Sequence, residues 1–298
     1  MLSDIKPTDP YILEMFEDPW IKYPVQSVGE LRNLVDKSIK FLGRKCHLNW
    51  IDISNIHTLS RVFYKKDFDG DISQWNVSHI TDMNSLFDQS TFNGDISNWN
   101  VSNVEDMTSI FACSRFNRDI SNWDVSNVKT MNAAFCATRF EGDISNWNVC
   151  SVEDMSGMFM HSTFNGDISK WDVSNVKLMN GMFGHCYFNG DISNWDVSNV
   201  NEMNSMFGYS KRFNQDISKW NVGKVYNMGL MFYASKFNQD ISSWDVSNVT
   251  NMNSMFGYAD FMQDISNWDV SNVEDAFDFN KGTKFPEEYR PKFITTID

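Results

Sequence analysis

A tryptophan returns at a fixed interval through most of this 298-residue chain. From Trp75 to Trp195 the spacing is 24 residues, and it becomes 25 once, before Trp220, where Lys211 and Arg212 stand in place of one residue. A block that recurs at this period is typical of a solenoid, in which each copy forms one coil and is stabilised by its neighbours. The period therefore predicts one elongated array, although a chain of this length could otherwise hold two domains.

The repeat divides the chain into four parts. Residues 1–48 do not repeat and are expected to form a helical N-terminal cap. A degenerate first repeat follows over 49–67, nine tandem 24-residue repeats occupy 68–277, and a C-terminal cap is expected over 278–298. Caps are needed because a terminal coil has no neighbour on its outer side.

The N-terminal part contains a clear helix signal. Ser27 and Glu30 form a capping box, in which each side chain bonds the other's backbone amide. Apolar residues then recur at helical spacing, and Gly43 is a typical stop. We predict an amphipathic helix over 28–42 that covers the open end of the core, with a further short helix over 11–16.

The first half of each copy predicts a short strand. Ile96, Trp99 and Val101 have the spacing of leucine-rich repeats. Trp99 and Val101 also alternate with the polar Asn98 and Asn100, as in a half-buried strand. Stacked copies of this segment would form a parallel strand ladder.

The second half predicts a short helix and a tight return. Ser102 and Glu105 resemble a second capping box, and Val104, Met107 and Phe111 would share one helical face. The segment Phe-Asn-Gly-Asp has turn chemistry, with Asn and Gly suited to positive φ. The fold class expected is an α/β solenoid, a right-handed leucine-rich-repeat-like coil stack of about 24 residues per coil.

The repeat block resembles a known family. Residues 188–207 hold Phe-Asn-Gly-Asp-Ile-Ser-Asn-Trp-Asp-Val-Ser-Asn-Val-x-x-Met-x-x-Met-Phe almost intact, and copies of it cover about 210 residues. It is similar to BspA-like leucine-rich repeat proteins, and more narrowly to the tandem surface-protein repeats of the mycoplasma lipoprotein type. The resemblance implies a leucine-rich-repeat-like solenoid, no known enzymatic activity, and roles in adhesion or protein binding.

Two invariant columns are expected to hold the coils together. The tryptophans are interpreted as core, with an exposed sugar-binding ladder as the alternative; they are Trp75, Trp99, Trp123, Trp147, Trp171, Trp195, Trp220, Trp244 and Trp268. The aspartates are interpreted as turn residues that accept backbone amides, with a row of calcium ions as the alternative; they include Asp95, Asp119, Asp143, Asp167 and Asp191.

The loop after Met-Phe varies most between copies and gathers basic and aromatic residues along one edge. Such residues are typical anchors of protein interfaces. The candidate partner-binding residues are Arg115, Arg139, His161, His185, Tyr187, Tyr209, Arg212, Tyr233, Lys236 and Tyr258. His161 and His185 would lie on neighbouring coils, but no carboxylate column adjoins them, so no metal site is predicted.

Charge and motifs exclude several functions. The net charge of −14 disfavours binding to nucleic acid or to an anionic membrane. Five cysteines without paired spacing suggest free thiols in a reducing compartment. Without a signal or spanning segment, a cytoplasmic location is expected, or the cell surface if a signal had been removed. No catalytic or phosphate-binding motif occurs, so no enzyme activity and no cofactor are predicted.

The sequence therefore favours a non-enzymatic scaffold that binds another protein through its variable columns, as a monomeric rod. A carbohydrate-binding or adhesin-type module is the alternative, and exposed aromatic rings in a row would be its mark. A hydrolase that uses stacked acids is a third, weaker hypothesis, because nine equivalent aspartates do not form a unique active site.

Overall fold

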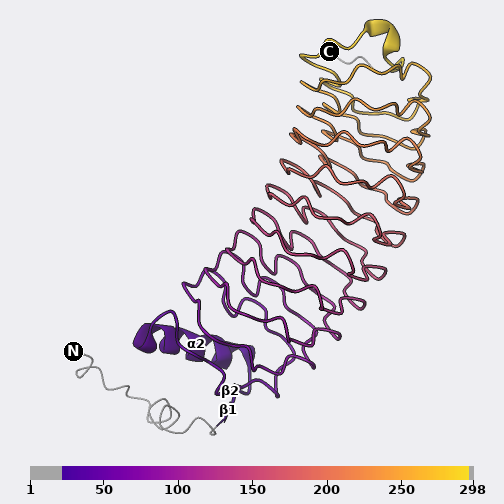
Figure 1. Cartoon of the computed structure of the whole chain (residues 1–298). Coiled ribbons are helices and arrows are strands. Elements are labelled where there is room, and N and C mark those ends of the chain that lie inside the picture. The colour runs from indigo at the N-terminus through magenta and orange to yellow at the C-terminus, as the bar shows by residue number, and fades with distance from the viewer. Residues whose placement is uncertain (1–21, 295–298) are drawn as a thin grey trace.

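The computed structural model describes residues 22–294. Successive coils stack in one direction into a long, gently curved solenoid, with helix α2 against its N-terminal end (Figure 1). One continuous apolar core runs from Val25 to Phe285 through every coil. The repeat period thus defines the architecture: each 24-residue copy is one coil of a solenoid.

Helix α2 (Val28–Leu42) has the bounds that the sequence predicts. The Ser27 hydroxyl accepts the Glu30 amide at 3.1 Å, as predicted, whereas the Glu30 carboxylate accepts the Gln26 amide at 2.8 Å and not the predicted Ser27 amide. The helix ends at Gly43, whose φ of 84° suits glycine. The short helix predicted over 11–16 lies outside the described residues.

Two short strands tie the N-terminal segment to the stack. Strand β1 (Tyr23–Pro24) pairs in parallel with β2 (Ile51–Asp52). On α2, Leu31 and Val35 are fully buried in the common core. The helix therefore covers the end of the core, where the first coil lacks a neighbour.

The coils themselves are built from turns, and the predicted strand at Trp99 and Val101 is wrong. Two successive turns are closed there by backbone hydrogen bonds. The Trp99 amide donates to the Ile96 carbonyl, and the Val104 amide donates to the Val101 carbonyl. The side chains of Asp95 and Asn100 accept amides two residues on, which bends the backbone at both places. Parallel bridges between coils occur instead at the residue before methionine, as from Asp82 to Asp106.

The predicted short helix after Ser102 is also absent. Ser109 and Cys113 have φ values of 53° and 52°, and a left-handed residue every fourth position cannot belong to a right-handed α-helix. The α/β description of the coil is therefore wrong: within the described residues the repeats contain neither α-helices nor extended strands. Handedness of the coil stays a prediction.

The left-handed residues allow a dense backbone ladder between coils. In one coil, the amides of Met155, Gly157, Phe159 and His161 donate to carbonyls of the next coil at 2.7–3.0 Å. The intervening amides close turns within the coil. Nearly every polar backbone group of this segment is thereby bonded, which is what burial requires.

Aromatic side chains fill the core in continuous stacks. Phe159 and Phe164 of one coil lie with ring centroids 4.1 Å apart, and Phe159 stacks on Phe183 of the next coil at 5.9 Å. The nine repeat tryptophans are 3–5 % exposed. Each indole donates to a carbonyl of the preceding coil, as Trp171 does to Ile144 at 3.1 Å. These tryptophans therefore pack and bond the coils rather than face solvent.

The glycine of Phe-Asn-Gly-Asp has a different role from the one predicted. Gly94 and Gly190 are not among the positive-φ residues. A Cβ at Gly94 would lie 2.7 Å from the Phe92 ring, and one at Gly190 would lie 2.7 Å from Phe188. The glycine is needed because the phenylalanine of its own turn folds back over it.

The C-terminal end is closed by non-repeating residues. The 3-10 helix η1 (Glu287–Tyr289) lies beyond the last coil (Figure 1). Phe285 is buried and Phe293 packs on Phe279 with ring centroids 5.0 Å apart. No helix in residues 22–294 is long and apolar enough to cross a membrane.

Candidate functional site

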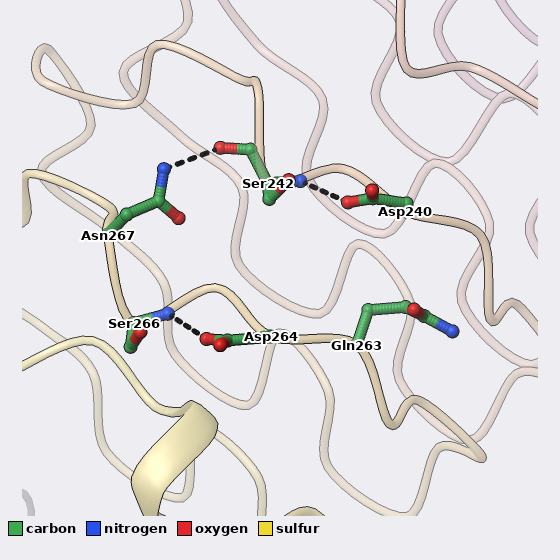
Figure 2. Close-up of a pocket in the computed structure, with 6 residues that line it drawn as sticks. All are labelled: Asp240, Ser242, Gln263, Asp264, Ser266 and Asn267. Carbon is green, nitrogen blue, oxygen red and sulfur yellow. Dashed lines mark hydrogen bonds between the residues drawn. The ribbon is translucent and has the colours of Figure 1, made fainter.

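The aspartate column forms turns and leaves little for a ligand. A hollow of about 340 Å³ is lined by residues of two coils, among them Asp240 and Asp264. Figure 2 shows these two aspartates and the serines that they bond. Each carboxylate accepts the amide of the serine two residues on, at 2.9 Å. These backbone bonds lower the pKa of both aspartates below the ordinary value. The carboxylates are thus committed to their own turns, as the Asx-turn interpretation predicts.

The other predicted turn aspartates have the same geometry. Each accepts a serine amide at 2.9–3.0 Å, and the pKa of each is lowered, first by that bond: Asp95, Asp119, Asp143, Asp167 and Asp191. Nowhere in residues 22–294 do three His, Cys, Asp or Glu side chains converge on a point that could hold a metal ion. The calcium hypothesis therefore gains no support from the geometry.

Five predicted residues form a continuous aromatic row along one edge. The row consists of His161, His185, Tyr209, Tyr233 and Tyr258, on five successive coils. Ring centroids are 4.4 Å apart for the two histidines, 4.1 Å for His185 and Tyr209, 5.0 Å for Tyr209 and Tyr233, and 5.7 Å for Tyr233 and Tyr258. Tyr209 and Tyr258 are 43 % and 51 % exposed. An exposed ladder of this length is a surface that a partner can cover.

The backbone fixes the position of this row. His161, His185, Tyr209 and Tyr258 all have φ between 54° and 60°. Their amides donate to the following coil at 2.6–2.8 Å, so each side chain is projected from a rigid ladder. A row held in this way loses little conformational freedom when a partner binds.

Basic residues lie beside the aromatic row. The Arg212 guanidinium stacks over the Tyr187 ring at 4.5 Å, and Tyr187 is 49 % exposed. Lys236 forms an ion pair with Asp260 at 2.5 Å. Arg115 and Arg139 are exposed on earlier coils, at the position that Arg212 and Lys236 occupy in later ones. On those earlier coils, Cys113 and Ala137 stand where the row has aromatic residues. The predicted residues therefore separate into a contiguous group from 161 to 258 and two arginines before it.

The environment of His185 disfavours its charged form. Partial burial lowers the pKa of His185, and the neighbouring His161 and Lys211 lower it further. Desolvation disfavours an imidazolium, and nearby cations repel it. Positive charge is therefore disfavoured at this ring of the row.

The sequence analysis did not predict a small pocket beside the row, which we call the notch. It has a volume of about 200 Å³ and is lined by Met160, Gly184, Gly208 and Leu230, together with Ser205 and the aromatic row from His161 to Tyr233. The signal was present in the position after each repeat phenylalanine, where two successive glycines stand between Met160 and Tyr233. Comparing side-chain volume along that column would have revealed it.

The fold and the edge together define the class: this is a repeat solenoid whose invariant columns build the stack and whose variable columns form one exposed surface. The chain belongs to the family described as DUF285, Mycoplasma protein of unknown function, which matches residues 30–141, 112–208, 132–236 and 185–291. These overlapping matches cover residues 30–291, which hold most of helix α2 and all nine repeats.

Similarity to individual proteins is weak. No curated protein matches the sequence. Among solved structures, an internalin from Listeria monocytogenes matches with a TM-score of 0.31 and 8 % sequence identity, over 80 % of this chain and 75 % of the internalin chain.

Proposed function

We propose that this protein is a non-enzymatic interaction module that binds another protein through the aromatic row and the basic residues beside it. The observation that supports this proposal is the row itself, five rings in contact on successive coils, of which His161, His185 and Tyr209 are stacked, with Tyr209 and Tyr258 about half exposed. Tyrosine and arginine in such a setting are the residues that most often contribute binding energy at interfaces.

A sugar-binding function has less support. The tryptophans that could have formed a sugar platform are buried. In the row, His161, His185 and Tyr209 lie face to face, with interplanar angles of 27° and 15°. Their ring faces cover one another, whereas stacking on a sugar requires a free face. Glycan binding is therefore the comparison to be tested, not the function proposed.

The test uses a photocrosslinking residue in place of Tyr209 in the full chain. Benzoylphenylalanine at this position should crosslink a discrete protein in cells that carry the protein naturally. The matched control places it at Tyr226, which is 43 % exposed but lies in a different column of the coil. A crosslink of equal yield at both positions, or at Tyr226 alone, would remove the row from the function.

A further inference from the structure

The notch beside the aromatic row exists because two successive coils lack a side chain in one column. The position after each repeat phenylalanine carries Met160 and Tyr233 at the two ends of the notch, and Gly184 and Gly208 between them. These glycines do not have positive φ, but a Cβ at Gly184 would lie 3.3 Å from the Ser205 carbonyl oxygen and one at Gly208 would lie 3.1 Å from that of Leu230, so any larger residue must shift the coil slightly. Their lack of side chains opens about 200 Å³ of space against the row.

The notch is suited to an apolar group. The amides of Gly184 and Gly208 donate within their own turns, and their carbonyls accept the amides of His161 and His185 at 2.8 Å. The Ser205 hydroxyl bonds Asn204 at 2.9 Å. An apolar group could cover this floor without leaving a backbone polar atom unpaired, which is the main cost of burying such atoms.

The volume corresponds to one side chain. A cavity of about 150 Å³ lined by apolar residues is large enough to hold benzene. Met160, Leu230, Tyr209 and Tyr233 line the walls here. The space therefore fits a single leucine, methionine or phenylalanine side chain rather than a sugar ring with its several hydroxyl groups.

The charge around the notch differs from that of the whole chain. The four segments 155–166, 179–190, 203–215 and 228–239, which carry the edge, contain no aspartate or glutamate. They contain Lys211, Arg212 and Lys236, in a chain whose net charge is −14. Asp260, on the next coil, pairs with Lys236, so among the described residues the cations beside the notch without an ion pair are Lys211 and Arg212. This part of the edge is a cationic patch on an acidic solenoid, and it complements a partner segment rich in carboxylates.

We infer that the notch receives one apolar side chain from an acidic, extended segment of a partner protein, with Lys211 and Arg212 contacting the carboxylates that flank it. This inference rests on the proposed function, because it assigns a partner chemistry to the same edge. It adds that binding energy is concentrated at one pocket on two coils rather than spread along the row.

The test is a selection of phage-displayed random dodecapeptides on the immobilised full chain. Recovered peptides should share one Leu, Met or Phe flanked by Asp or Glu. Gly184→Met fills the notch with the residue that the same column carries at position 160, and it should weaken binding about tenfold or more. Cys136→Met introduces the same side chain at a partly exposed position of the same column outside the notch, and it should leave the affinity within about twofold.

A second measurement does not depend on a variant that folds. In the wild-type chain with 13C-labelled methionine methyl groups, the Met160 signal should shift when a selected peptide is added, whereas the exposed Met262 signal should not. Peptides that lose affinity in Tyr209→Ala but bind Gly184→Met normally would overturn the notch while leaving the proposed function intact. Failure to recover any peptide, recovery of basic peptides, or a glycan bound by the wild type and lost in Gly184→Met would also overturn it. If the Tyr209 photocrosslink fails as well, the proposed function is refuted with it.

Discussion

The tryptophan column gives a stability prediction with a magnitude. Trp171 is 4 % exposed, lies against Phe159 at 6.3 Å between ring centroids, and donates its indole N–H to Ile144 at 3.1 Å. Trp171→Ala removes the whole ring from a core that can relax only partly, so we expect a loss of about 3–5 kcal/mol in the free energy of unfolding. The same change should lower the urea midpoint of the transition.

Trp171→Phe separates the hydrogen bond from the packing. The Ile144 carbonyl also accepts the Trp147 amide, so it keeps one partner when the indole is removed. The lost bond should therefore cost about 0.5–1.5 kcal/mol. The smaller ring adds part of a cavity penalty, and we expect a total of about 1–3 kcal/mol.

The assay is urea unfolding of the full chain followed by circular dichroism, with the slope of the transition compared between variants. Tyr226→Phe, which removes an exposed hydroxyl bonded to Glu202, is the control and should change stability by less than about 0.5 kcal/mol. A loss below about 1 kcal/mol in Trp171→Ala, or equal losses in both tryptophan variants, would refute the reasoning.

Three further predictions concern other columns. Gly190→Ala should lower the free energy of unfolding by about 1–3 kcal/mol, and with it the melting temperature, because the new Cβ would lie 2.7 Å from the Phe188 ring. An unchanged melting temperature would contradict this close approach. Asp191 has a lowered pKa, so its contribution to folding stability is present above the unfolded-state pKa near 3.8 and is lost as pH falls through the folded-state value. The fall in melting temperature on acidification should therefore be smaller in Asp191→Asn. An identical dependence on pH in the two proteins would contradict this prediction. Lys177→Ala removes an ion pair with Glu153 at 2.7 Å, but both side chains are more than half exposed, so the urea midpoint should hardly move, and a large shift would show that the pair matters more than exposure implies.

The sequence was sufficient for the period, the core and the N-terminal helix. Trp171 and its equivalents recur at an interval that only stacking explains, and Ser27 and Glu30 mark the start of α2 through local chemistry. These features depend on residue types whose preferences agree with the fold.

The internal structure of a coil could not be obtained in the same way. Val104, Met107 and Phe111 have helical spacing, but a backbone that reverses at Ser109 also places them inward. Nothing in a serine or an alanine indicates positive φ, because the conformation is imposed by hydrogen bonds to the next coil rather than by the residue. Local propensity was overridden by contacts that are distant in sequence.

The candidate edge was predicted as a set of residues but not as a shape. The predicted partner-binding residues include every member of the aromatic row, whereas the notch depends on what Gly184 and Gly208 lack. Absence of a side chain becomes informative only when neighbouring coils are aligned in space.

The extra residue at Lys211-Arg212 has a consequence for how such chains can diverge. Before and after it, bonds between coils join residues 24 apart, and across it the Asn214 amide reaches the Asn189 side chain, 25 residues away, at 3.0 Å. The insertion is taken up at the exposed edge, and the register of every other column resumes. Relatives could therefore gain or lose residues at this edge, and so acquire new specificities, without any compensating change in the interior.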